Sequence, residues 1–266
     1  MGALEGRVAL VTGASRGIGA AIARRLAAEG AAVAAVARTL EPGGGLPGSL
    51  AETVTAIRDG GGQAVAVAAD LSRDEAREDA VDRVTGRLGP VDVLVNNAAV
   101  TWFGPTDRFP AKRSRLMWAV QVEAPLHLAQ LVVPGMRAAG GGWICNISSG
   151  AARHPAVPPA GPARGSTLYG MCKAALERFS TGLAAELVAD RIAVSALSPT
   201  AVVPTPGTVF HGLTSEGDPA AEPVEVMAEA ALLLCSRPPD QVSGRVAYSQ
   251  DLLRELGVPV PGGGTA

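Results

Sequence analysis

The chain has 266 residues, of which 47% are hydrophobic and only 3% aromatic, and its formal net charge is −2. It is long enough to bury a substantial core. The near-neutral charge and the lack of a long basic run argue against an electrostatic nucleic-acid binder. No apolar run reaches the roughly 18 residues that a membrane span needs. No signal-peptide pattern precedes the apolar run at Val8. We therefore expect a cytoplasmic protein without a membrane or nucleic-acid partner.

The potential metal ligands are scattered along the chain. The cysteines form no CxxC pair, and the histidines form no HExxH motif. These residues are Cys145, Cys172, Cys235, His127, His154 and His211. An odd number of widely spaced thiols is typical of buried, unpaired cysteines in a reducing compartment. The sequence therefore predicts neither a metal site nor a disulfide framework.

Short apolar runs alternate with longer, helix-compatible segments. The runs are almost continuously apolar, as strands are when both faces of a parallel sheet are covered. They predict strands at 7–13, 31–38, 63–70, 91–97, 143–149 and 192–199, with a further strand near 245–248. The intervening segments predict helices at 17–29, 49–59, 73–87, 112–138 and 169–188. Two of these helices open with capping-box patterns, Ser49-x-x-Glu52 and Ser72-x-x-Glu75.

This alternation predicts an α/β fold with one doubly wound parallel sheet and helices on both faces. No repeat or linker divides the pattern, so we expect residues 1–257 to form a single domain. Pro/Gly-rich segments interrupt it at 41–49, 153–165 and 258–266. The first two are expected to be loops at the rim of the sheet, and the last a disordered tail.

A glycine-rich turn, TGASRGIG (12–19), follows the first strand and opens the first helix. Its glycines allow a tight turn and a close approach to a ligand, and the helix N-terminus offers unpaired N–H groups to an anion. At the first βα junction these features favour a dinucleotide pyrophosphate over a turn without a ligand. The candidate contacts are Gly13, Ser15, Arg16, Gly17, Ile18 and Gly19.

A tyrosine and a lysine share one face of a predicted helix. Lys112 and Lys173 are the only lysines, and Lys173 follows Tyr169 by four positions. A phenol with a pKa of about 10 exchanges protons poorly at neutral pH, and a neighbouring ammonium would stabilise the phenolate. The pair is therefore a candidate acid–base group, the alternative being two side chains on a helix surface.

The order of these motifs resembles the short-chain dehydrogenase/reductase family. The motifs that match are TGxxxGxG at 12–19, Asp70, NNAA at 96–99, Ser149 and Tyr169-x-x-x-Lys173. The resemblance spans roughly residues 5–250. It implies a Rossmann-fold oxidoreductase that uses NAD(P)(H), acts on a small-molecule carbonyl compound or alcohol, and assembles as a homodimer or homotetramer.

The resemblance also assigns roles to single residues. Ser149 would hydrogen-bond the substrate oxygen, Tyr169 would act as general acid or base, and Lys173 would lower the tyrosine pKa and bind the ribose hydroxyls. Ser148 competes for the serine role, but the second serine of the pair matches the family. The other implied cofactor contacts are Asp70 at the adenine with its neighbour Leu71, and Asn97, Ala98, Pro199 and Thr205.

The end of the second predicted strand bears on the choice of cofactor. Ala37 stands where relatives that prefer NAD usually carry an acidic residue for the ribose hydroxyls. Arg38 follows it and Arg16 lies in the glycine turn, so two guanidinium groups could flank a 2′-phosphate. We therefore expect NADP(H), with NAD(H) less favoured; the alternative is two solvated surface arginines.

The chain departs from the family pattern at three places. Gln121 stands where many relatives carry a catalytic asparagine that helps hold a water in a proton relay. Ser149 and Tyr169 are 20 positions apart, so 153–165 is an insertion, either an arch over the substrate mouth or a solvated excursion. Pro199 is followed by Thr200 instead of glycine, and 200–221 is expected to form a substrate lid.

The leading hypothesis is an NADP(H)-dependent ketone reductase or secondary-alcohol dehydrogenase. Its catalytic residues would be Ser149, Tyr169, Lys173 and Gln121. The alternative is a cofactor-binding sensor or scaffold with weak or no catalysis, which Gln121 alone favours. The absence of a GxSxG elbow argues against a hydrolase.

Overall fold

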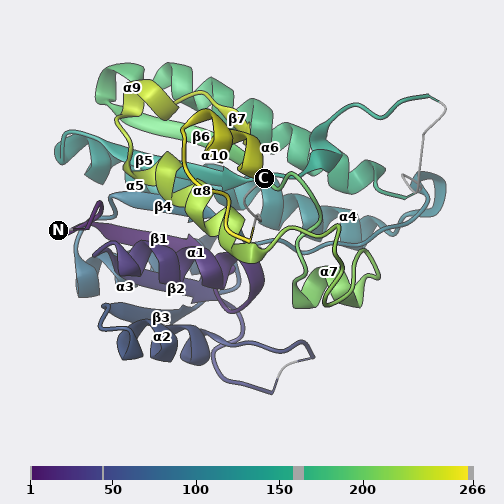
Figure 1. Cartoon of the computed structure of the whole chain (residues 1–266), viewed down its shortest axis with the longest axis horizontal. Coiled ribbons are helices and arrows are strands. Elements are labelled where there is room, and N and C mark those ends of the chain that lie inside the picture. Colours follow the sequence, from purple (N-terminus) through teal and green to yellow (C-terminus); the bar gives the residue numbers. More distant parts are fainter. Residues whose placement is uncertain (1, 44, 158–164, 263–266) are drawn as a thin grey trace.

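A single parallel sheet organises the chain, for which the computed structural model describes residues 2–43, 45–157 and 165–262. Its seven strands lie in the order β3-β2-β1-β4-β5-β6-β7 (Figure 1). They are β1 (Val8–Thr12), β2 (Ala32–Ala37), β3 (Ala64–Ala68), β4 (Val93–Asn96), β5 (Gly142–Ile147), β6 (Ile192–Ser198) and β7 (Val246–Tyr248). All seven predicted strands are present, and the predicted Rossmann-type fold class is confirmed. The strand order reverses between β1 and β4: β2 and β3 are added on one side of β1, and β4 and the later strands on the other.

Helices cover both faces of this sheet. On one face lie α1 (Gly17–Ala28), α2 (Leu50–Asp59), α8 (Val224–Ser236) and α10 (Ser249–Glu255). On the other lie α3 (Asp74–Leu88), α5 (Ala124–Ala138) and α6 (Thr167–Glu186). The shorter elements are η1 (Thr106–Arg108), α4 (Ala111–Trp118), η2 (Ala119–Glu123), η3 (Gly150–Ala152), η4 (Val188–Asp190), α7 (Pro206–Phe210) and α9 (Pro239–Val242). The sequence reading did not single out α8, a helix with nine buried residues.

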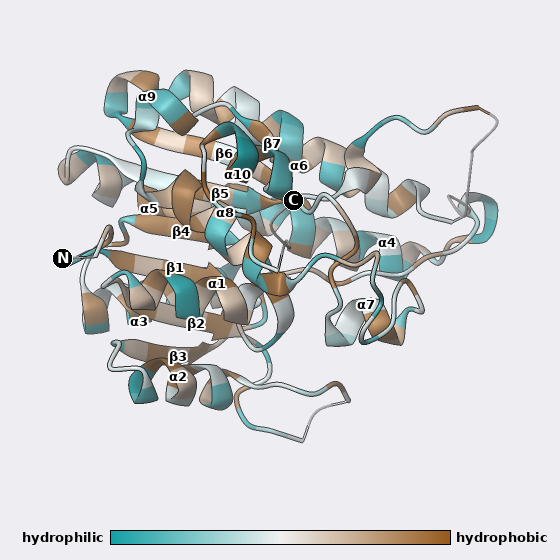
Figure 2. Cartoon of the chain, in the orientation of Figure 1, coloured by the Kyte–Doolittle hydropathy of each residue, from teal (hydrophilic) through white to brown (hydrophobic). Residues whose placement is uncertain are grey.

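The alternation of side chains along each strand divides the core into two layers. In β1, Ala9 and Val11 pack with α1 and α8, whereas Val8 and Leu10 pack with α3 and α5. Successive strand residues point to opposite faces, and here both faces are covered. The strands are accordingly apolar along their length, and Figure 2 shows them as the brown centre of the molecule.

The two predicted capping boxes have different outcomes. Ser49 caps α2, because its hydroxyl accepts a 3.1 Å hydrogen bond from the Glu52 N–H. Ser72 does not cap α3, which begins at Asp74 after Arg73. Its hydroxyl instead donates to Asp70 at 2.8 Å. A nearby carboxylate therefore competes successfully for the serine that the local pattern assigned to the helix.

The helical stretch Ala111–Ala138, formed by α4, η2 and α5, is by length and composition apolar enough to cross a membrane. No such stretch was predicted, because the prediction rested on uninterrupted apolar runs alone. In the fold its residues Leu128, Val132 and Met136 are buried in the core layer shared with α3. Core packing thus buries part of this apolar stretch.

The packed chain continues beyond the predicted domain end at residue 257. Val258 and Val260 pack against the core layer of α1 and α8, and the Val258 N–H donates to the Leu253 carbonyl at 2.9 Å. The segment expected to be a disordered tail therefore begins with two residues that bury apolar surface. Residues 263–266 lie outside the described residues.

Candidate functional site

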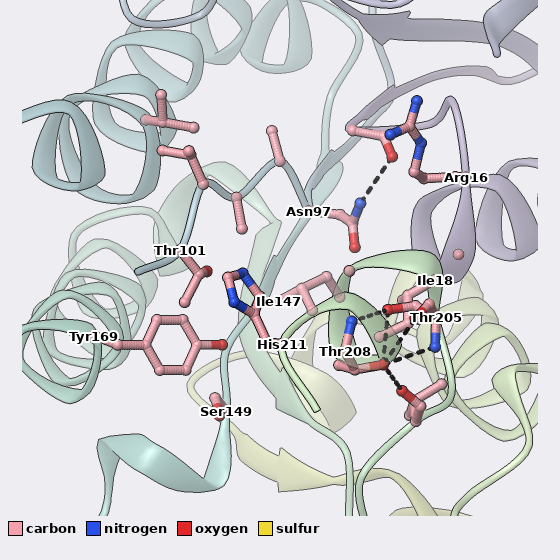
Figure 3. A pocket seen from close by; sticks show the side chains of 18 of the residues that line it. Arg16, Ile18, Asn97, Thr101, Ile147, Ser149, Tyr169, Thr205, Thr208 and His211 are labelled. Atoms are coloured by element: carbon pink, nitrogen blue, oxygen red, sulfur yellow. Dashed lines mark hydrogen bonds between the residues drawn. The ribbon is translucent and has the colours of Figure 1, made fainter. Parts of the chain in front are cut away.

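A cavity of about 770 Å³ lies at the carboxyl ends of the strands. Ligands of doubly wound sheets bind at this edge, where the strand order reverses. The cavity extends from the glycine turn to Tyr169, and Figure 3 shows side chains from both regions pointing into it. The predicted site residues that line it are Gly13, Ser15, Arg16, Gly17, Ile18, Arg38, Asp70, Leu71, Asn97, Ala98, Ser149, Tyr169, Lys173, Pro199 and Thr205.

The glycine turn is packed too tightly for larger residues. Gly13 has a φ of +66°, and a Cβ there would lie 2.8 Å from the Ala98 Cα. A Cβ at Gly19 would lie 2.3 Å from Asn97 Nδ2. Gly19 is thus a packing residue below the turn and does not line the cavity. The turn presents bare backbone at the start of α1, which suits a phosphate group.

Asn97 fixes the glycine turn to the neighbouring strand. Its Nδ2 donates to the carbonyls of Thr12 at 3.0 Å and Gly13 at 3.3 Å. The Thr12 hydroxyl accepts from the N–H groups of Asn97 and Ala98 at 2.9 and 3.0 Å. The ends of β1 and β4 are therefore held together across the switch point, so the turn keeps its shape.

The two predicted phosphate-binding arginines lie at one end of the cavity. Arg16 donates from Nη2 to the Gly48 carbonyl at 2.8 Å and to Thr39 Oγ1 at 3.4 Å. This guanidinium is held between the glycine turn and the loop after β2, and its buried Nε has no partner among the described residues. Arg38 is exposed and lines the cavity.

Asp70 lies at the same end of the cavity. Although burial raises the pKa of this carboxyl, hydrogen bonds from Ser72 and the charge of Arg38 outweigh it and leave the pKa below its usual range. The carboxylate is therefore ionised at neutral pH. With the two arginines, it makes this end the charged part of the site.

Ser149, Tyr169 and Lys173 come together where β5 ends and α6 begins. Ser149 lies close enough to Tyr169 to act on the pKa of the phenol, and Figure 3 shows the tyrosine hydroxyl facing the cavity. The Ser149 hydroxyl also accepts from the Ala151 N–H at 3.2 Å, which fixes it at the start of η3. Lys173 lies one helical turn after Tyr169, with Nζ 5.8 Å from the centre of the tyrosine ring.

Burial dominates the electrostatics of this pair. It lowers the pKa of Lys173 to about 8, although Cys172 and Glu177 act in the opposite direction. Burial also raises the pKa of Tyr169, and Ser149 opposes that shift. In the protein alone the pKa of Tyr169 is therefore raised, because the desolvation of the phenolate outweighs the lowering effect of Ser149.

Gln121 does not line the cavity, contrary to its predicted place beside the reacting groups. It is buried in the π-helical turn η2, and its Nε2 donates to the Val100 carbonyl at 3.0 Å. Its Oε1 is buried without a partner among the described residues. Since Val100 itself lines the cavity, Gln121 supports the wall from behind.

The predicted lid folds over the cavity as α7 and its flanking loops. Thr205 caps α7, and its hydroxyl accepts from the Thr208 N–H at 3.2 Å. Its methyl group lies against the glycine turn, since a Cβ at Gly17 would be 3.0 Å from Thr205 Cγ2. At the base of the lid, the buried Glu222 carboxylate accepts hydrogen bonds from the Ser249 hydroxyl at 2.6 Å and the Thr200 N–H at 3.2 Å.

An aromatic group beside Tyr169 was not predicted from the sequence. Phe103 meets Tyr169 edge to face at a centroid distance of 5.8 Å, and meets His211 at 5.4 Å. His211 in turn contacts Phe210 at 5.3 Å. The sequence signal for this group was the pair Trp102-Phe103, which follows the NNAA motif after two residues in a chain with few aromatic residues.

The insertion at 153–165 is only partly described, since residues 158–164 lie outside the described residues. Residues 153–157 are exposed. At the other end, the Gly165 carbonyl accepts from the Gly104 N–H at 3.0 Å, next to Phe103. Its effect on substrate choice stays a prediction.

Comparisons with known proteins agree with this geometry. Residues 7–211 match the sequence profile of the short chain dehydrogenase family. The chain is 30% identical over 257 residues to hydroxysteroid dehydrogenase-like protein 2 of Danio rerio. That alignment covers 97% of this chain but only 60% of the relative, so the chain spans about three fifths of that protein's length.

Two solved structures share the whole fold. A metagenomic short-chain oxidoreductase in complex with NADP is 32% identical, with a TM-score of 0.76 over 92% of this chain and 98% of that one. L-Sorbose reductase from Gluconobacter frateurii, complexed with NADPH and L-sorbose, is 30% identical. Its TM-score is 0.79 over 93% of this chain and 96% of that one.

Proposed function

The chain belongs to the short chain dehydrogenase family, and we propose that it is an NADP(H)-dependent oxidoreductase that interconverts a ketone and a secondary alcohol. The observation that carries the proposal is one cavity that joins the glycine turn to the neighbouring side chains of Ser149 and Tyr169. A cofactor site and an acid–base group thus open into the same space. The two similar structures contain NADP or NADPH, one of them with a sugar substrate.

The residues at the cofactor end fit a dinucleotide phosphate. The glycine turn offers backbone N–H groups at the start of α1, in a cradle that a Cβ at Gly13 would fill. Arg16 and Arg38 add two guanidinium groups, of which Arg16 has a buried N–H without a partner among the described residues. Ala37 leaves the end of β2 without a carboxylate. These features favour a 2′-phosphate, and therefore NADP(H) over NAD(H).

The chain's own residues supply the proton and the orientation. A bound nicotinamide would supply the hydride to the carbonyl carbon, or accept it from the alcohol in reverse. The Ser149 hydroxyl would hold the substrate oxygen in place. Tyr169 would donate its proton to that oxygen during reduction and take it back during oxidation. Lys173 would provide the positive charge that stabilises the resulting phenolate.

The alternative is a protein that binds the cofactor as a sensor or scaffold with little turnover. Two observations favour it: Gln121 does not line the cavity, and burial raises the pKa of Tyr169. Against it, Ser149, Tyr169 and Lys173 are all present and lie close together.

Turnover measurements separate the two candidates. The purified chain is mixed with NADPH and a panel of ketones, and NADPH absorbance is followed. The proposal predicts ketone-dependent oxidation of NADPH with alcohol as product, and slower turnover with NADH. Tight NADPH binding without turnover of any ketone would favour the sensor. Faster turnover with NADH than with NADPH would refute only the proposed preference for NADP(H).

A further inference from the structure

We propose that the substrate is an uncharged, mainly apolar carbonyl compound or alcohol that carries a ring, with few polar groups besides the reacting one. This inference rests on the proposed function and concerns the part of the cavity beside Tyr169. That part is lined by an apolar wall, defined here as Trp102, Phe103, Leu116, Val202, Phe210 and Leu213. The wall comes from three separate segments: the loop after β4, helix α4 and the lid.

Aromatic residues are concentrated at this wall. The chain contains four Phe, three Trp and two Tyr, and four of these line this one cavity. Phe103 touches both Tyr169 on α6 and His211 on the lid, with interplanar angles of 72° and 89°. The rings therefore form a continuous surface that begins at the reacting hydroxyl, where a substrate ring can make edge-to-face or stacked contacts.

Some of this apolar surface is still free to be covered. Phe210 is 71% exposed and Leu213 is 48% exposed, although both line the cavity. Covering this area with an apolar ligand removes it from water, which favours binding. A ring compound seated on Phe103 would reach these lid residues, because Phe210 is linked to Phe103 through His211.

No charged side chain among the described residues belongs to this part of the cavity. The charged lining residues are Arg16, Arg38 and Asp70 at the cofactor end, together with Lys173. Lys173 is buried and already donates to the Ile147 carbonyl at 2.8 Å. Arg113 lies over the Trp102 ring at 5.3 Å but does not line the cavity. A carboxylate or phosphate on the substrate would thus lose water without gaining a counter-charge.

Few hydroxyl or imidazole groups are available to a polar substrate. The threonine hydroxyls of the lid are engaged within the protein: Thr205 with Thr208, and Thr200 with Ser249. Thr208 also donates to the Val203 carbonyl at 2.7 Å. Among the described lining residues beside Tyr169, the polar side-chain groups of Thr101, Trp102 and His211 make no hydrogen bond within the protein. A polyhydroxylated substrate would leave most of its hydroxyls unpaired, which costs binding energy for each one.

The test compares three neutral ketones with NADPH as the cofactor: 1-tetralone, the ketose L-sorbose and 2-butanone. The wild-type chain is expected to show a kcat/KM for 1-tetralone at least about 100-fold above that for L-sorbose. Phe210→Ala should lower the value for 1-tetralone by about 10- to 200-fold, since it removes a large hydrophobic contact. The loss that the same variant shows for 2-butanone, a ketone without a ring, should be at least about tenfold smaller than the loss for 1-tetralone. Leu126→Ala, on the exposed surface of α5 outside the cavity, is the control and should leave all three values unchanged.

Failure of this inference can be distinguished from failure of the proposed function. If kcat/KM for L-sorbose equals or exceeds that for 1-tetralone, the proposed substrate class is wrong, but the proposed oxidoreductase activity is not affected. If Phe210→Ala lowers kcat/KM for 1-tetralone and for 2-butanone by the same factor, the proposed substrate class is also wrong. If no ketone is turned over, binding is measured instead by the fluorescence of the tryptophans, one of which, Trp102, lines the cavity. Binding of 1-tetralone that is weakened by Phe210→Ala would then support the apolar site, and equal or tighter binding of L-sorbose would refute it.

Discussion

The Lys173 ammonium donates a 2.8 Å hydrogen bond to the backbone carbonyl of Ile147, the last residue of β5. This bond holds the ammonium at the end of the sheet, two residues before Ser149 in the chain. Lys173 is only 3% exposed, and its burial explains why its pKa falls to about 8. An ammonium with a pKa of about 8 loses its charge in a pH range in which activity can be measured.

We expect turnover to fall as the pH rises through about 8, because the charged form of Lys173 stabilises the Tyr169 phenolate. The tyrosine itself, with a raised pKa, does not titrate there. The folded-state pKa of Lys173 is lower than its unfolded value, so the unfolded chain binds more protons between about 8 and 10.5. The contribution of this lysine to stability therefore rises with pH where activity falls.

The measurements for this prediction are the pH profile of kcat/KM and unfolding at the same pH values. Lys173→Met should abolish most turnover, whereas Lys112→Met, at the only other lysine, which is exposed on α4, should change nothing. A rate that stays constant to pH 10 would exclude Lys173 as the charged group.

The charge of Glu177 is expected to set the pH at which turnover begins to fall. The Ser148 hydroxyl donates to Glu177 Oε1 at 2.7 Å, and the carboxylate raises the pKa of Lys173 against the effect of burial. Glu177→Gln removes that charge, so the alkaline decline should move to lower pH. Glu186→Gln, exposed at the end of the same helix, is the control. An unchanged profile in Glu177→Gln would show that its charge does not reach the lysine.

The two arginines of the cofactor end should differ in their effects. Arg38 is exposed at the cavity, and Arg38→Ala should weaken NADPH binding by about 1.5–3 kcal/mol with little effect on NADH. Arg16 also holds the loop after β2 through the Gly48 carbonyl, so Arg16→Ala should weaken both cofactors. Binding is measured by titration, with the exposed Arg24→Ala on α1 as control. If Arg38→Ala leaves the NADPH-to-NADH affinity ratio unchanged, Arg38 does not bind the 2′-phosphate.

Gln121 is expected to act on the shape of the cavity. Gln121→Leu leaves the Val100 carbonyl without its donor, which should cost about 1–3 kcal/mol of unfolding free energy. Gln121→Asn has a side chain one methylene shorter and should also lose this contact. Denaturant unfolding and KM for the ketone are measured together, with the exposed Gln130→Leu on α5 as control. Full stability with a selective loss of kcat would instead place Gln121 in the proton relay.

The sheet and the glycine turn could be predicted from the sequence because their signals are local. A strand such as β1 is buried at every position and apolar at all but its last residue, Thr12, and its glycine turn follows directly. The Ser72 cap was wrong because Asp70, which competes for that serine, sits outside the capping pattern. A capping-box pattern specifies only the serine and the residue three positions later, so it does not show that another carboxylate binds the same serine.

The shape of the substrate end could not be predicted, since it depends on which segments meet in space. Phe103 and His211 are separated by more than a hundred residues and touch only because the lid folds back over the loop after β4. Gln121 was assigned correctly to a helix, but its direction depends on the π-helical turn η2, which rotates the residues that follow.

The most direct test of the central claim is the turnover of Tyr169→Phe. This variant keeps the ring that packs against Phe103 and removes only the hydroxyl. With NADPH and 1-tetralone, kcat should fall by about 100- to 10,000-fold, while NADPH affinity and the unfolding midpoint stay close to those of the wild type. Tyr248→Phe, at the only other tyrosine, which lies outside the cavity under Arg153, should retain full activity. A Tyr169→Phe protein that keeps most of its kcat would contradict the assignment of Tyr169 as the general acid and base.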